Sequence, residues 1–164
     1  MLKGRAVVRK DGKLRYWWHR NSVAKRFDVD APFTFTIVRN PYSRTVSAFK
    51  YLKKRGKINY GIEFKRFVTK TLSRQGEKFD PHFMPQCRWP LTMDQIGFDL
   101  IGYFERLDQD WYAISERIGV GANLPHANRT SSQDWREFFD DETQNIVYEL
   151  YRRDFEELGY SFQI

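Results

Sequence analysis

The chain has 164 residues, and its 28 Lys and Arg against 21 Asp and Glu give a formal charge of +7. This excess favours an anionic ligand or partner, without separating a nucleotide from a nucleic acid. Aromatic residues make up 17% of the sequence, which excludes a disordered composition and predicts a single packed domain over residues 1–164, and the lone Cys87 excludes an intrachain disulfide.

Residues 1–32 are expected to form a hairpin and an approach segment to the core, which covers the rest of the chain. Residues 5–18 contain two strand-like pieces around Asp11-Gly12, a pair that favours a tight hairpin turn. A two-stranded hairpin is marginal by itself. We therefore expect Trp17 and Trp18 to be buried against the main domain or against a second copy of the chain, which would make a homodimer.

A strand followed by a capped helix is predicted around Pro41. Residues 33–38 are aromatic and β-branched, as in a buried parallel strand. Asn40 is expected to cap the next helix, with Pro41 at its first position, where the missing N–H costs nothing. The first-turn amides would then be unpaired, and such amides bind phosphate. The junction is therefore predicted to be an anion site.

The helix predicted over residues 41–54 has two faces. Asn40, Arg44, Ser47 and Tyr51 share one face, and apolar residues occupy the other. At about 1.5 Å rise per residue, Ser47 lies roughly 10 Å beyond the cap, too far to share an anion with the first-turn amides alone. A phosphate held by both Arg39 and Ser47 must lie along the flank of the helix.

Further helices and one further strand follow. The basic run at 53–57 is typical of a solvated helix end, with anion binding as the alternative. A core-facing helix is predicted over 62–72, a long loop over 76–97, and a second strand over 98–104. Asp108 is expected to cap the helix that comes next.

The carboxyl-terminal part predicts another loop over 119–134 and then one long helix through Leu158, closed by Gly159. The order of the elements favours an α/β domain with helices against a mostly parallel sheet, in which ligands gather at the carboxyl ends of the strands. Arg39 and Glu105 each follow a strand, so we expect both to face one cleft.

Metal and membrane sites are not predicted. His82 and Cys87 are five residues apart and the other histidines are remote, so no usual metal-ligand spacing appears. No apolar run of about 18 residues occurs, and the first residues lack the apolar centre of a signal peptide. If the given start is native, we expect a soluble, cytoplasmic protein.

The string Ile-Val-Arg-Asn-Pro-Tyr-Ser-Arg-Thr-Val-Ser-Ala-Phe, residues 37–49, resembles the 3′-phosphate-binding motif of the carbohydrate sulfotransferases. These enzymes move a sulfuryl group from 3′-phosphoadenosine 5′-phosphosulfate to a sugar hydroxyl. Further segments keep the family's order, and the likeness covers about four-fifths of the chain. They are residues 80–86, 101–105, 124–128 and 151–155, with Gly159-Tyr160.

The resemblance departs from the family at the amino terminus. The family normally opens with a strand and a loop of the type Pro-Lys-Thr-Gly-Gly-Thr-Ser, which holds the 5′-phosphosulfate, and no such stretch precedes Phe33. The resemblance thus implies a three-layer, P-loop-like sulfotransferase fold that is incomplete at its amino terminus. Either an amino-terminal piece is lost, or the protein binds the donor without transferring from it efficiently.

The resemblance also implies roles for particular residues. Arg39 and Ser47 would contact the 3′-phosphate, and the loop with Asn128 and Arg129 would close over the nucleotide. No metal is required in the family.

For the base that takes the acceptor's proton we favour His82, because an imidazole accepts a proton at neutral pH and the residue lies in the long loop beside the expected cleft. Glu105 is the second candidate, although it could simply cap the following helix. Gln86 and Arg88 could contact an acidic sugar.

Three functions remain open from sequence. The first is a sulfotransferase acting on a hydroxyl of a saccharide or similar polar acceptor, which the ordered motifs favour. The second is a nucleotide-binding relative without turnover, favoured by the missing loop. The third is a basic nucleic-acid-binding module, which charge permits but no fold signature supports. We expect the first, with no nucleic acid as partner.

Overall fold

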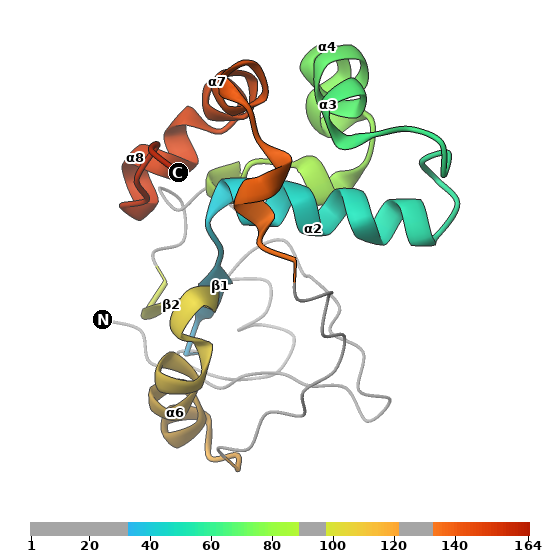
Figure 1. The fold of residues 1–164 in the computed structure, drawn as a ribbon. Coiled ribbons are helices and arrows are strands. Elements are labelled where there is room, and N and C mark those ends of the chain that lie inside the picture. Colours follow the sequence, from blue (N-terminus) through green and yellow to red (C-terminus); the bar gives the residue numbers. More distant parts are fainter. Residues whose placement is uncertain (1–32, 89–97, 122–132) are drawn as a thin grey trace. The chain divides into compact units, whose positions relative to one another are not determined.

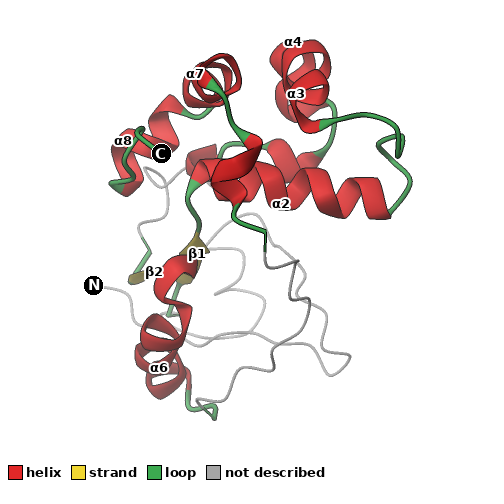
Figure 2. Cartoon of the chain, viewed as in Figure 1, coloured by secondary structure: helices red, strands yellow, loops and turns green. Residues whose placement is uncertain are grey.

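The computed structural model describes residues 33–88, 98–121 and 133–164, which belong to two compact units. Helices predominate in both (Figure 2). The hairpin predicted for residues 5–18, with Trp17 and Trp18, lies outside the described residues. The elements, labelled in Figure 1, are β1 (Phe35–Val38), β2 (Leu100–Tyr103) and α6 (Leu107–Ile118) in one unit, and α2 (Pro41–Lys54), α3 (Phe64–Phe67), α4 (Ser73–Gln75), α7 (Asp141–Leu150) and α8 (Arg152–Leu158) in the other.

The first unit is built on two parallel strands. β1 pairs with β2 in the register Phe35 to Leu100 through Val38 to Tyr103, so the predicted parallel pairing and the α/β class are confirmed. Both strands are shorter than predicted, by two residues at the start of β1 and by three over both ends of β2. α6 packs against them through Trp111, whose ring lies 6.4 Å from that of Phe35.

Helix α6 begins differently from the prediction. Asp108 is not the cap: Arg106 precedes the first helical residue, and no side chain caps it. Asp108 lies in the first turn, where its carboxylate still favours the positive end of the helix dipole. Asp110 links the helix to the strand, because its carboxylate accepts the N–H of Tyr103 at 2.6 Å and that of the Arg106 side chain at 3.0 Å.

In the second unit, α2 has the predicted bounds and lies beside α3 and α7 (Figure 1). The core-facing helix predicted over 62–72 is present from Phe64, but its second half, Val68–Leu72, is a π-helical turn before α4. The long loop predicted over 76–97 contains three short 3-10 turns within its described part, and the second of these, Pro81–Phe83, carries His82.

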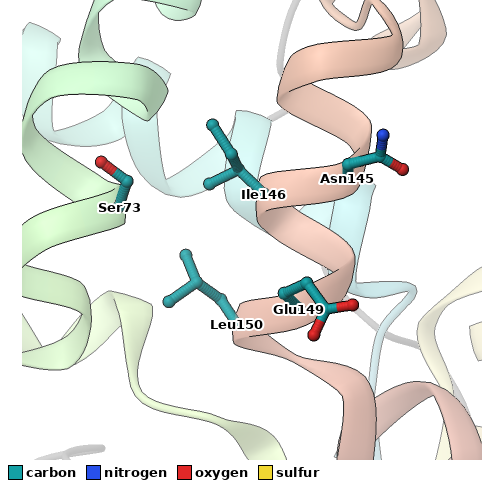
Figure 3. A pocket seen from close by; sticks show the side chains of 5 residues that line it. All are labelled: Ser73, Asn145, Ile146, Glu149 and Leu150. Atoms are coloured by element: carbon teal, nitrogen blue, oxygen red, sulfur yellow. The ribbon is translucent and has the colours of Figure 1, made fainter.

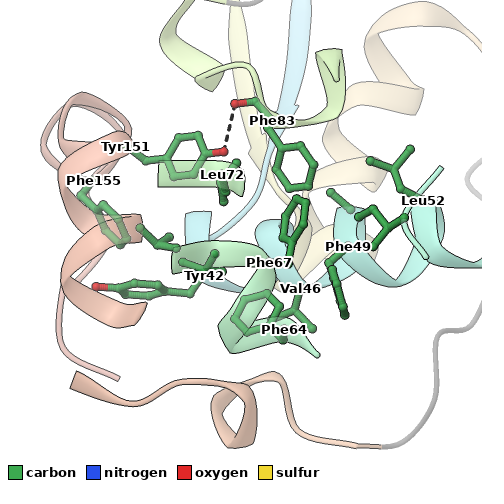
Figure 4. Close-up of a cluster of buried hydrophobic side chains, with 14 residues drawn as sticks. Tyr42, Val46, Phe49, Leu52, Phe64, Phe67, Leu72, Phe83, Tyr151 and Phe155 are labelled. Atoms are coloured by element: carbon green, nitrogen blue, oxygen red, sulfur yellow. Dashed lines mark hydrogen bonds between the residues drawn. The ribbon is translucent and has the colours of Figure 1, made fainter. Parts of the chain in front are cut away.

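A largely aromatic core holds this second unit together (Figure 4). Phe67 contacts Phe83 with ring centroids 5.4 Å apart, and Phe49 meets Phe64 edge to face at the same distance. Each buried ring removes enough apolar surface to contribute about 1.5–3 kcal/mol. The core therefore fixes the 3-10 turn at Phe83 against α2 and α3. The buried cluster comprises Tyr42, Val46, Ala48, Phe49, Leu52, Ile58, Phe64, Phe67, Val68, Leu72, Phe83, Val147, Tyr151 and Phe155.

The prediction of a single long final helix is wrong, because α7 and α8 are separate helices that meet at Tyr151. This residue leaves the helical conformation, with φ −119° and ψ 23°. Its ring is buried in the core, and its hydroxyl donates to the carbonyl of Phe83 at 2.9 Å (Figure 4). A tertiary contact thus interrupts the helix, whereas Gly159, with φ +71°, ends α8 as predicted.

Candidate functional site

The site begins at the cap of α2, where one prediction is confirmed and another is wrong. Asn40 caps the helix and Pro41 takes its first position, as expected. However, the Asn40 side chain itself accepts the N–H of Tyr42 at 2.9 Å and of Ser43 at 3.3 Å, and the N–H of Arg44 bonds the Asn40 carbonyl. The first-turn amides are therefore already paired, and an anion here must be held by side chains.

Arg39 is fixed at this junction by both its backbone and its side chain. The amide group of Gln86 accepts the Arg39 N–H at 2.9 Å and donates to the Arg39 carbonyl at 2.7 Å. The side-chain Nε of Arg39 donates to the hydroxyl of Ser43 at 2.9 Å. Gln86, which the sequence suggested as a sugar contact, thus has its amide engaged with the backbone of Arg39.

Ser43, Ser47 and Tyr51 stand on successive turns of α2, so the guanidinium of Arg39 lies along the face that carries Ser47. The face runs about 12 Å along the axis from Ser43 to Tyr51. Ser43 is buried, Ser47 is half-buried, and Tyr51 is 47% exposed. The predicted anion contacts Arg39 and Ser47 therefore lie on one flank of one helix.

His82 lies at the far end of this face. Its ring packs on that of Tyr51 with centroids 5.0 Å apart. Its Nδ1 is 2.6 Å from Oδ1 of Asp80, which also accepts the backbone N–H of His82 at 3.0 Å. Half of the His82 side chain is exposed, whereas Asp80 is 4% exposed. Asp80 was not singled out from sequence, although its position two residues before the histidine is a signal that could have found it.

The carboxyl of Asp80 also accepts Nζ of Lys57 at 2.8 Å. Burial by itself raises the pKa of this carboxyl, but the hydrogen bonds from Lys57 and from the backbone and ring of His82 outweigh burial and lower the pKa to about 2. In the same basic run, Nζ of Lys53 donates to the carbonyl of Ile62 at 2.9 Å. The basic run at 53–57 is therefore partly structural.

A second buried carboxylate, that of Asp154 in α8, holds the segment that carries Gln86. It accepts the backbone N–H of Gln86 at 2.7 Å and of Cys87 at 2.9 Å. Burial lowers the pKa of the nearby Arg44 guanidinium, and the charges of Tyr151 and Asp154 oppose that shift. The charge of Arg44 therefore lies close to the carboxylate of Asp154, which favours the charged guanidinium.

The surroundings of Cys87 disfavour its thiolate, the form that acts as a nucleophile. Cys87 is buried, and burial together with the neighbouring Asp154 raises the pKa of its thiol well above the ordinary range. No group of three or more potential metal ligands occurs within the described residues. No helix in the described part of the chain is long and apolar enough to cross a membrane.

Of the remaining predicted catalytic and nucleotide-binding residues, the structure describes only Glu105. Glu105 is exposed in the 3-10 turn that follows β2, in the other unit, and no side-chain hydrogen bond caps α6. Asn128 and Arg129 lie outside the described residues. A shallow, mostly apolar groove between α4 and α7, into which Ile146 and Leu150 point, contains none of the predicted site residues (Figure 3).

Comparison with known proteins identifies the class. A sequence model of the sulfotransferase family matches residues 14–161. Carbohydrate sulfotransferase 11 of Mus musculus is 29% identical over 168 residues, covering 77% of this chain and 46% of that protein. The Rattus norvegicus protein of the same name gives the same values. The chain thus spans just under half the length of these two relatives.

A third relative, an uncharacterized protein of Archaeoglobus fulgidus, is 30% identical over 118 residues, covering 72% of this chain and 92% of that protein. No solved structure matches. The chain belongs to the sulfotransferase family, whose enzymes transfer sulfuryl groups. The resemblance to carbohydrate sulfotransferases inferred from the motifs is confirmed.

Proposed function

We propose that the protein transfers a sulfuryl group from 3′-phosphoadenosine 5′-phosphosulfate to a hydroxyl of a saccharide. The observation that carries the proposal is the polar face of α2. Arg39 and its partner Ser43 lie at one end of this face, Ser47 stands one turn further on, and the ring of His82 packs on that of Tyr51 at the other end.

The anchor for the donor is the end with Arg39. A guanidinium and serine hydroxyls are the donors that suit a phosphate, and Arg39 is held by Gln86 through two backbone hydrogen bonds. Binding energy gained at the 3′-phosphate, remote from the reacting sulfur, orients the donor for in-line attack.

His82 acts as the general base in this proposal. Its ring nitrogen takes the proton of the acceptor hydroxyl, whose oxygen attacks the sulfur as the bond from sulfur to the bridging oxygen breaks. The leaving group, adenosine 3′,5′-bisphosphate, departs with the electron pair of that bond. The exposed ring of Tyr51 beside His82 offers a stacking surface for a sugar, and the exposed Lys54 and Arg55 favour an acidic one.

A second candidate is a relative that binds the nucleotide without transferring from it. The observation that supports it is the same face of α2, since Arg39 and the neighbouring serines suit nucleotide binding whether or not transfer follows. The two candidates agree on nucleotide binding at Arg39 and differ only in turnover.

Calorimetric titration with adenosine 3′,5′-bisphosphate tests the shared part. Arg39→Ala is expected to weaken binding about 10- to 100-fold, since a hydrogen bond to a charged group contributes about 1.5–3 kcal/mol. Arg74→Ala, which removes the same charge from an exposed position of α4, is the matched control and should change nothing. Equal binding by the wild type and Arg39→Ala would refute the site.

Transfer of radiolabelled sulfate from the donor to neutral and uronic-acid-containing oligosaccharides then separates the two candidates. Turnover that is lost in His82→Ala while nucleotide affinity is kept supports the transferase. Binding without transfer to any acceptor supports the second candidate. Salt-sensitive binding of an oligonucleotide, unaffected by Arg39→Ala, would instead favour the nucleic-acid alternative.

A further inference from the structure

The carboxylate of Asp80 is almost completely buried and makes three hydrogen bonds. One oxygen, Oδ1, accepts the backbone N–H of His82 and lies 2.6 Å from its Nδ1, and the other, Oδ2, accepts Nζ of Lys57. Aspartate is rarely buried to this degree unless its charge is paired and hydrogen-bonded. The arrangement does more than cap the 3-10 turn Pro81–Phe83, because a cap needs only the backbone hydrogen bond.

We propose that Asp80 is a positioning residue for His82, whose neutral imidazole it holds in the tautomer with the proton on Nδ1 and the lone pair on Nε2. For the use of that lone pair as a base, the inference rests on the proposed function. The tautomer itself is a property of the resting protein and can be measured without any substrate.

The chemistry of the two groups fixes the tautomer. With its pKa lowered to about 2, the Asp80 carboxyl is ionised at neutral pH and can only accept hydrogen bonds. Nδ1 must therefore be the donor in the 2.6 Å contact, and Nε2 carries the lone pair. The Tyr51 ring on one side of the imidazole and the backbone hydrogen bond at Asp80 fix its orientation.

The isosteric change Asp80→Asn cannot preserve this pattern while Lys57 is present. If the amide oxygen faces His82, the amide NH₂ meets the ammonium of Lys57. If the oxygen faces Lys57, the NH₂ meets the backbone N–H of His82 and forces Nδ1 to become an acceptor. Removing the ammonium as well, in Asp80→Asn with Lys57→Met, frees the amide to turn its oxygen to His82.

Nitrogen NMR of the full chain with ¹⁵N-labelled histidine tests the tautomer, with His82→Gln to assign the signals. At alkaline pH, where imidazoles are neutral, the wild type is expected to show a protonated Nδ1 at His82. Asp80→Asn should move the population toward a protonated Nε2, and the double variant with Lys57→Met should move it back. A wild-type ring protonated on Nε2, or a tautomer unaffected by Asp80→Asn, would overturn the proposal.

Kinetics test the consequence for transfer. Asp80→Asn is expected to lower kcat about 10- to 10³-fold, which is less than the full effect of about 10²–10⁴-fold that a general base contributes, and to leave the KM for the donor unchanged. The double variant should recover part of kcat. A purely structural role would instead raise the donor KM together with the loss of kcat, and an unchanged kcat would exclude positioning. If the wild type transfers to no acceptor, the proposed function fails, while the NMR result still decides the tautomer.

Discussion

Replacing Asp154 with alanine should strongly destabilise the unit that carries α2. Its side chain is completely buried, and each carboxylate oxygen accepts one backbone N–H, from Gln86 and from Cys87. An unsatisfied buried donor costs about 1–3 kcal/mol, so two of them cost roughly 2–6 kcal/mol. The buried charge of Arg44 also loses its anionic neighbour. We expect a loss of about 3–5 kcal/mol, a large part of the 5–15 kcal/mol typical of a domain.

Urea denaturation followed by circular dichroism measures this loss as a lower midpoint at an unchanged m-value. Asp108→Ala, at an exposed position in the first turn of α6, is the control and should stay within about 0.5 kcal/mol of wild type. Adding Arg44→Met to Asp154→Ala should recover part of the stability, because it removes the uncompensated charge. A loss below about 1 kcal/mol for Asp154→Ala would refute the reasoning.

Three further predictions concern other positions. A Cβ at Gly102 would lie 2.6 Å from the Ile37 side chain and 3.4 Å from that of Ile114. Gly102→Ala should therefore lower the free energy of unfolding by about 1–3 kcal/mol, seen as a lower Tm, and an unchanged Tm would contradict this packing. Because burial raises the pKa of the Cys87 thiol, Ellman's reagent should react with it only in denaturant, and rapid reaction of the native protein would contradict its burial. The pKa of the Asp80 carboxyl is about 2 in the folded protein against an ordinary 3.8, so its ionised form adds about 2 kcal/mol to the free energy of unfolding. This stability is present above about pH 4 and is lost as the pH falls toward about 2. In acid unfolding, Asp80→Asn should not show this loss.

Local sequence signals predicted the bounds of α2 correctly, but the expectation for the hydrogen bonding of its first-turn amides was wrong. Both bounds of the helix follow from nearby residues: the Asn40 cap and Pro41 at its start, and the lysines of the last turn at its end. The amides were wrongly expected to be unpaired, because the same cap side chain that starts the helix also satisfies them. The capping rule was right, and only its consequence for anion binding was missed.

Long-range contacts explain what the sequence could not predict. Gln86 is 47 residues from Arg39 and 68 from Asp154, and no local pattern joins them. The break at Tyr151 has the same origin, since an apolar periodicity that continues through α7 and α8 hides a hydroxyl committed to a carbonyl 68 residues earlier. Helix ends that depend on a local cap or glycine, as in α2 and α8, can be predicted, whereas the break at Tyr151 and the partners of Gln86 are decided by tertiary packing.

The segment from Asp80 to Cys87 links the two ends of the candidate site. At its start Asp80 orients His82, in its middle Phe83 is anchored in the core, and at its end Gln86 clamps the backbone of Arg39. A displacement of this short segment therefore moves the base and the anion anchor together rather than one at a time. A variant that loosens it, such as Asp154→Ala, should weaken nucleotide binding as well as lower kcat, whereas Asp80→Asn should lower kcat and leave nucleotide binding unchanged.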